Sequence, residues 1–237
     1  MNVKKAAALL LVCLFVLACG CSRVLPERSE GAEEGGESSE SSVAETRDYP
    51  ELGAASIDSL ELIEAANARL SVRYSSDEWY ADESSDPLTL YYQPMMESGR
   101  AVNINVQRLS ECGAAPLEDD MNAMLDEFRE GYPYLSISSA EMRTLCGDRV
   151  ILMDAVMQFT DQTIDDMLAA KAWTQEWLDA NGGREAMLAI PPADQLYLYA
   201  VRDGWMYLFV GTYYEPEQRA VVLSEMTVLA QTVGNVD

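Results

Sequence analysis

The sequence predicts an α+β fold in which helices cover an antiparallel β-sheet, an αβα sandwich. Seven segments either alternate apolar with polar residues or form short apolar runs, which is typical of strands. Three longer segments repeat their apolar residues at helical spacing. Short turn signals join several strand segments directly, as antiparallel neighbours require. The predicted order is β-β-β-α-β-β-α-β-β-α, and the interspersed amphipathic helices must pack on the sheet.

The first residues carry a processing signal. Lys4 and Lys5 precede the apolar run 6–17, which is too short for a bilayer span of about 20 residues and typical of a signal peptide. The run ends in Val16-Leu17-Ala18-Cys19-Gly20, which resembles the lipobox of bacterial lipoproteins. The resemblance implies a diacylglycerol on the Cys19 thiol and cleavage before it, so residues 1–18 are a lipoprotein signal peptide. An ordinary secretory peptide, or modification at Cys21, is the alternative.

A diacylglycerol supplies the two acyl chains that stable anchoring needs. We therefore expect the mature chain on the extracytoplasmic face of the cell membrane, held by lipid and without a transmembrane helix. Residues 19–48 predict a lipidated, flexible, acidic linker, because the stretch 30–42 has no apolar residue larger than Ala. Such a linker keeps the domain about 25–30 Å from the membrane on average. Residues 49–237 are then a single α+β globular domain.

The charge of the chain restricts its partners. It has 40 acidic residues, 16 lysines and arginines and no histidine, for a net charge of −24. Such a surface repels nucleic acid, so we exclude a nucleic-acid partner. Solubility is one explanation of the acidity, and a specific cationic partner is the other.

The first half of the domain begins with a short predicted helix, 56–68, and a strand, 70–74. A polar loop containing Trp79 follows, and then a second strand, 88–93. In the segment 102–107, Val and Ile alternate with Asn and Gln, which predicts a strand with one solvated face.

A helix follows, opened by Pro116, with acids in its first turn and its end at Gly131-Tyr132-Pro133. Its apolar stripe is Leu117, Met121, Met124, Leu125 and Phe128. Two strands come next, 134–145 and 149–160, joined around Gly147-Asp148. The second is nearly all apolar and is therefore predicted to be central and buried.

The last part begins with Asp161, which caps a predicted helix, 162–180, closed by Asn181-Gly182-Gly183. A hairpin, 196–213, turns at Asp203-Gly204, a type I′ signal. A terminal helix, 216–233, completes the domain. Its predicted inner face carries Val222, Met226, Leu229 and Val233.

These elements carry a second resemblance. The strand 70–74 ends in an aromatic residue shortly before Trp79, and a polar-apolar strand, a long helix, two hairpins and a terminal helix follow. This order over residues 68–234 resembles the PsbP-like superfamily, with residues 162–192 as an insertion. The resemblance implies a binding or assembly factor that is not an enzyme, and it transfers no site residue.

Several chemistries lack their residues. Without histidine there is no Ser-His-Asp triad, no imidazole base and no His-bound zinc. No phosphate-binding loop or EF-hand motif occurs. The doublets Asp119-Asp120 and Asp165-Asp166 lie in helix first turns, where the helix dipole accounts for acids. We expect no catalytic residue, no metal site and no cofactor.

Two pairs are candidates for other roles. Trp173 and Trp177, four residues apart, predict a binding surface, and packing on the sheet is the alternative. Cys112 and Cys146 are candidates for a disulfide, and two free thiols are the alternative. Tyrosines are common in the predicted strands, where they suit half-buried faces and can also expose a binding face: Tyr91, Tyr92, Tyr197, Tyr199, Tyr207, Tyr213 and Tyr214.

The sequence thus favours a membrane-anchored, non-catalytic binding or assembly module whose partner is an unidentified envelope component or protein. Two other functions stay open. One is an extracytoplasmic hydrolase that uses carboxylates, and the other is a purely structural envelope protein.

Overall fold

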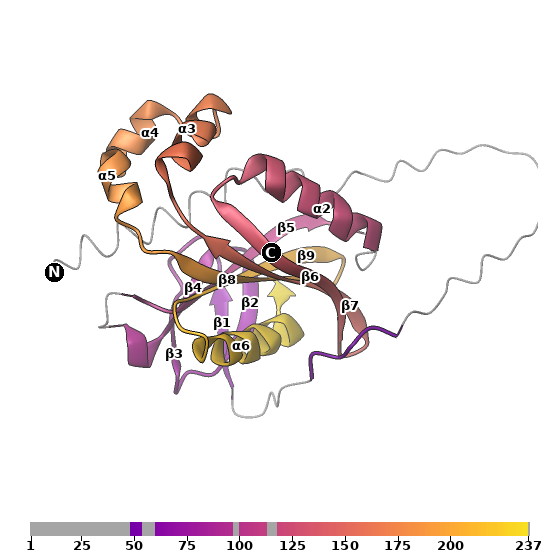
Figure 1. Cartoon of the computed structure of the whole chain (residues 1–237). Helices are drawn as coiled ribbons and strands as arrows, with labels where there is room; N and C mark the ends of the chain where they lie inside the picture. Colours follow the sequence, from indigo (N-terminus) through magenta and orange to yellow (C-terminus); the bar gives the residue numbers. More distant parts are fainter. Residues whose placement is uncertain (1–47, 54–59, 97–99, 113–117, 237) are drawn as a thin grey trace, which may run out of the picture.

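The computed structural model describes residues 48–53, 60–96, 100–112 and 118–236. They form an α+β fold built on an antiparallel seven-stranded sheet of order β3-β4-β5-β9-β8-β7-β6, which confirms the predicted class (Figure 1). A second, three-stranded sheet has the order β1-β2-β10. The strands of the large sheet are, in that order, β3 (Trp79–Asp82), β4 (Leu88–Tyr92), β5 (Asn103–Glu111), β9 (Trp205–Tyr213), β8 (Ala193–Arg202), β7 (Asp148–Met157) and β6 (Leu135–Leu145).

Two hairpins fix the register of the inner strands. Asp203 and Gly204 have φ of 49° and 79°, so the β8–β9 turn has the two positive φ values of the predicted type I′ turn. Cys146 and Gly147 repeat this pattern between β6 and β7, with φ of 53° and 86°. The strand β7 is largely buried and pairs with both β6 and β8, but it is not central as predicted, since it lies next to the edge strand β6.

One face of the sheet carries α2 (Glu118–Gly131) and three short helices, α3 (Asp161–Ala169), α4 (Gln175–Ala180) and α5 (Gly183–Leu188) (Figure 1). The predicted helix 162–180 is therefore wrong as one element. The chain leaves α3 at Lys171, where φ is 57°, and Thr174 then caps a new helix through its side chain. Thr160 caps α3, in place of Asp161.

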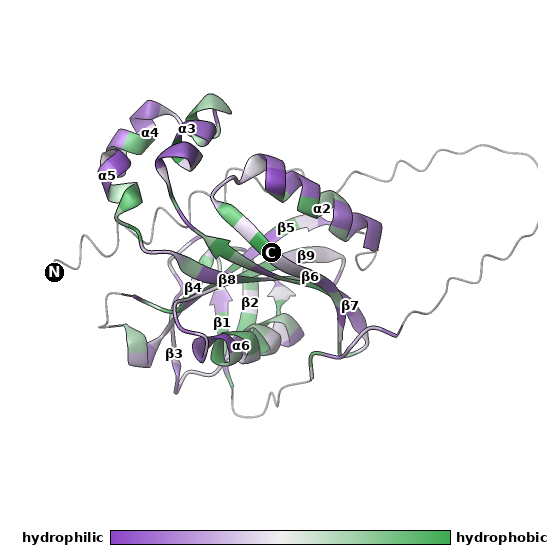
Figure 2. Cartoon of the chain, viewed as in Figure 1, coloured by the Kyte–Doolittle hydropathy of each residue, from purple (hydrophilic) through white to green (hydrophobic). Residues whose placement is uncertain are grey.

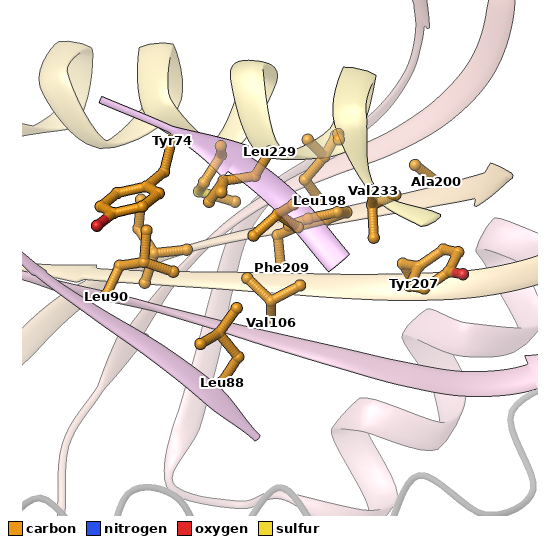
Figure 3. Close-up of a cluster of buried hydrophobic side chains, with 14 of the residues drawn as sticks. Tyr74, Leu88, Leu90, Val106, Leu198, Ala200, Tyr207, Phe209, Leu229 and Val233 are labelled. Carbon is orange, nitrogen blue, oxygen red and sulfur yellow. The ribbon is translucent and has the colours of Figure 1, made fainter. Parts of the chain in front are cut away.

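The other face carries α6 (Gln218–Thr232), which lies between the large sheet and the small sheet of β1 (Glu61–Ala65), β2 (Leu70–Tyr74) and β10 (Gly234–Asn235). Apolar residues therefore occur around much of α6, as its colouring in Figure 2 shows. The predicted inner face of α6 is buried in full. Figure 3 shows Leu229 and Val233 of this helix region packed near Leu198 and Phe209 of the sheet.

Three predictions near the start of the domain are wrong. Part of the expected helix 56–68 lies outside the described residues, and the rest is strand β1 and a turn, because Ile63 and Ala65 pair with β2. The expected loop at Trp79 is strand β3. The supposedly solvated face of β5 is buried, with Asn103 6% and Asn105 4% exposed. A short 3-10 helix, η2 (Gln93–Met95), follows β4.

No helix among the described residues is both long and apolar enough to cross a membrane.

Candidate functional site

A row of cross-strand neighbours crosses the large sheet on the face that carries α2. Because side chains alternate between the two faces of a strand, all residues of this row lie on the same face of the sheet. The register pairs follow one another from the edge strand β3 inward, and the members on β3, β4, β5, β9 and β8 are all polar or aromatic: Tyr80, Tyr91, Asn103, Thr212 and Gln195.

Buried polar side chains of this face satisfy one another. Thr89 donates its hydroxyl to Asn105 Oδ1 at 2.9 Å, and Asn105 Nδ2 donates to Asn103 Oδ1 at 3.1 Å. On the next strands, Gln195 Nε2 donates to the Thr212 hydroxyl at 3.2 Å. Because each amide has a partner, burial costs these groups little, and they hold strands β4, β5, β8 and β9 in register.

The row ends in an aromatic pair at the open edge of the sheet. Tyr80 and Tyr91 stack with ring centroids 6.4 Å apart and planes 22° apart. Tyr80 is 51% exposed, while Tyr91 is half-buried behind it. Burial raises the pKa of Tyr91, and the Asp82 carboxylate adds to that rise. This part of the sheet therefore combines an exposed aromatic face with nearby negative charge.

The opposite edge of the sheet receives the start of the domain. Residues 49–52, here called the N-terminal clamp, run parallel to the end of β6. Thr144 N–H donates to the Pro50 carbonyl at 3.0 Å, and Leu52 N–H donates to the Thr144 carbonyl at 2.8 Å. The Glu51 carboxylate accepts from the Thr144 hydroxyl at 2.6 Å and from Cys146 N–H at 2.8 Å. These bonds attach the N-terminal clamp firmly to one corner of the sheet.

The N-terminal clamp and the tyrosine pair lie at diagonally opposite corners. The row of Tyr80 crosses β6 at Ile137, seven residues before Thr144, so the two lie about 23 Å apart along the strands. Six strand spacings separate β3 from β6, which is about 29 Å across the sheet. The first described residues therefore meet the large sheet at the corner diagonally opposite Tyr80.

A groove of about 590 Å³ lies beside α6. Its walls include Leu52, Pro216, Leu223 and Thr227, and Arg219 is the one cation among the described residues that line it. That guanidinium binds the Asp154 carboxylate with two bonds, of 2.8 and 3.0 Å, which raise the pKa of Arg219. Because its charge is already balanced, the groove offers apolar and neutral polar surface rather than a free cation.

The candidate surface at Trp173 and Trp177 is mostly core. Trp173 is only 5% exposed and packs between Tyr134 and Phe159, and Trp177 lies 4.8 Å from it, partly covered. The two do not share a helix, since Trp173 precedes α4. The prediction of a binding surface is therefore wrong for Trp173, because packing of the three short helices needs its ring.

The predicted disulfide is not formed. Cys112 and Cys146 are both thiols. Cys112 follows β5 and Cys146 precedes β7, with β9 and β8 between those strands, which puts the two cysteines roughly 14 Å apart. A disulfide needs Cα atoms within about 7 Å, so the strand order excludes the pairing.

The other candidate residues lie outside the described residues or have structural roles. Cys19 lies outside the described residues. Asp161 and Asp165 of α3 both form ion pairs with Arg184, and Asp119 and Asp120 lie in the first turn of α2. Within the described ranges, no three acidic or cysteine side chains are grouped as metal ligands. The exposed Tyr80 was missed in the sequence, although the alternation Trp79-Tyr80-Ala81 is a strand signal.

Comparisons with known proteins give a distant similarity of fold. No protein-family model matches the chain, and no curated protein matches its sequence. The solution structure of cyanobacterial PsbP from Synechocystis sp. PCC 6803 is similar at 12% identity and a TM-score of 0.40, over 77% of this chain and 96% of that one. LpqN, involved in cell envelope biogenesis of Mycobacterium tuberculosis, is similar at 10% identity and a TM-score of 0.40, over 71% and 83%. A crystal structure from Bacteroides thetaiotaomicron follows, at 10% identity and 0.36, over 72% and 46%.

Proposed function

We propose that the chain is a lipoprotein held by Cys19 on the extracytoplasmic face of the cell membrane, and that its domain is a non-catalytic binding or assembly module. The observation that carries the proposal is the diagonal placement of the N-terminal clamp and Tyr80. The corner of the sheet at Tyr80 and Tyr91, here called the tyrosine corner, lies diagonally opposite the attachment of the N-terminal clamp, so a linker that joins the clamp does not cover it and a partner can reach it.

The anchor itself is supported by the N-terminal sequence. The apolar run 6–17 ends in Leu17-Ala18-Cys19-Gly20, and the acidic linker follows directly. Two acyl chains anchor stably, and a flexible linker raises the local concentration of the domain beside its neighbours in the envelope. Weak contacts at the tyrosine corner are then sufficient for association.

A non-catalytic role is supported by the missing histidine and by the ion pairs that hold the candidate acids of α3. An acid–base hydrolase needs two carboxylates facing one bound substrate. In this domain Asp161 and Asp165 are both bound to Arg184, and Asp154 is bound to Arg219. Binding is preferred to a purely structural role because the exposed ring of Tyr80 lies beside the negatively charged Asp82, a combination that can hold a cationic partner.

The anchor is tested by changing Cys19 to Ser in the full-length chain. We expect this variant to lose palmitate labelling and to leave the membrane fraction, because Cys19 is the residue that the lipobox pattern marks for lipid attachment. Cys21→Ser is the matched control and should keep both label and membrane association. Labelling that persists in Cys19→Ser and disappears in Cys21→Ser would contradict the assignment.

A further inference from the structure

The exposed face of Tyr80 is open to a flat or charged group. Because β3 is an edge strand, no other strand among the described residues pairs with it on its outer side. Tyr91 stacks behind it, at 6.4 Å, and holds its plane. One ring face is therefore fixed and accessible. The negative face of an aromatic ring attracts a cation that lies over it.

Acids lie before and after this ring along the chain. Asp82 ends β3 two residues after Tyr80, and alternation along the strand places both side chains on the same face of the sheet. Glu78 lies in the turn directly before β3, where its N–H donates to the Ser75 carbonyl at 3.1 Å. Five acids and no lysine or arginine occur between residues 75 and 86. Among the described residues, none of the ion pairs involves these acids. The negative charge around Tyr80 is therefore not neutralised within this part of the chain.

We propose that Tyr80, with Asp82 and the neighbouring acids of residues 75–86, binds an arginine side chain on a basic segment of a partner protein. This inference deepens the proposed function and rests on it. A guanidinium stacks flat on an aromatic ring and binds carboxylates with directed bonds, which makes arginine a better fit than lysine. The domain uses the same contact internally, since the Arg108 guanidinium lies 4.3 Å from the ring centre of Trp205.

Other ligands fit the site less well. A cationic lipid headgroup is disfavoured because its ammonium group cannot bind carboxylates with the paired, directed bonds that a guanidinium forms. A neutral sugar can also stack on a tyrosine, but it gains nothing from the charge of the flanking acids. Charge complementarity with a chain of net charge −24 favours a basic partner.

The test measures binding of a fluorescent arginine-glycine peptide to the full chain in neutral detergent micelles, by anisotropy. Tyr80→Ala should weaken binding roughly two- to fivefold, the range for an exposed cation–π contact. Tyr80→Phe should keep most of the affinity because it keeps the ring. Leu62→Ala is the matched control, since Leu62 is also 51% exposed but lies on β1 of the small sheet. Urea midpoints of all variants should agree, because these side chains are exposed.

The acids are tested by Glu78→Gln with Asp82→Asn, which should weaken binding and reduce its salt dependence. Glu130→Gln with Glu176→Gln removes the same number of charges from α2 and α4 and should leave the affinity within about twofold. The proposal is overturned if the peptide does not bind or if Tyr80→Ala binds it with unchanged affinity. It is also overturned if the two double variants lose the same amount of affinity for the peptide. Stronger Tyr80-dependent binding to phosphatidylcholine vesicles or to neutral oligosaccharides also overturns it. Membrane fractionation of Cys19→Ser reports on the anchor separately.

Discussion

Gly211 sets how closely α6 approaches the large sheet. A Cβ at this position of β9 would lie 2.2 Å from Val222 Cγ1 and 2.8 Å from Met226 Sδ, and both of those side chains are fully buried. Neither can move without displacing other core residues, because the helix is packed on two sides. The absent side chain is thus a packing requirement.

Gly211→Ala should therefore lower the free energy of unfolding by about 1–3 kcal/mol, the usual cost of overpacking. Urea denaturation of the full chain measures this. Gly131→Ala is the control, because a Cβ there meets nothing within 4 Å and alanine favours the helix. Equal midpoints for Gly211→Ala and the unchanged chain would show that α6 shifts freely, contrary to the packing described.

Burial of single polar residues was the hardest property to predict. The alternation in residues 102–107 identified the apolar face of β5 correctly. It wrongly placed Asn103 and Asn105 on a solvated face, because their burial depends on partners that are distant in sequence. Thr89 bonds Asn105, and Thr212 lies beside Asn103 on β9. A polar residue inside a sheet is recognised only when the pairing of its strand is known.

The three short helices α3–α5 depend on Trp173. Its ring contacts Tyr134 and Phe159 as well as Trp177, and it is 5% exposed. Trp173→Ala should cost about 3–5 kcal/mol of stability, as expected for truncation of a buried aromatic residue. Trp177→Ala should cost clearly less, because part of its ring is already in solvent. Thermal unfolding followed by circular dichroism compares the two, and equal losses would contradict this difference in burial.

Long elements with one strong period were predicted well, and short ones were not. The helix α2 and the helix α6 each repeat apolar residues over several turns, so their existence and buried stripe followed from the sequence. The segment 61–65 is too short to show a period, and it becomes β1 only because β2 pairs with it. Similarly, the disulfide prediction failed on strand order, since β9 and β8 insert between the strands of Cys112 and Cys146.

On the scale of the whole molecule, the two sides of the large sheet serve different purposes. One side is closed by α6 and the small sheet, whose apolar residues form a continuous core (Figure 3). The other side carries the short helices and the row that ends in Tyr80. The tyrosine corner could not be located from the sequence, because it exists only when β3 becomes an edge strand diagonally opposite the N-terminal clamp.

The net charge of −24 should make the stability of the domain depend on salt. Unbalanced acids repel one another over about 30 Å at 0.01 M ionic strength, and over only a few ångströms near 1 M. Raising NaCl at pH 7 should therefore raise the melting temperature, measured by scanning calorimetry. The exposed ion pairs oppose this trend when salt screens them, but each contributes only about 0–1 kcal/mol. Near pH 4, close to the pI of 4.1, the repulsion is small and the salt effect should largely disappear. A melting temperature that falls with salt at pH 7 would mean that the bonds of Arg184 and Arg219 outweigh the repulsion among the acids.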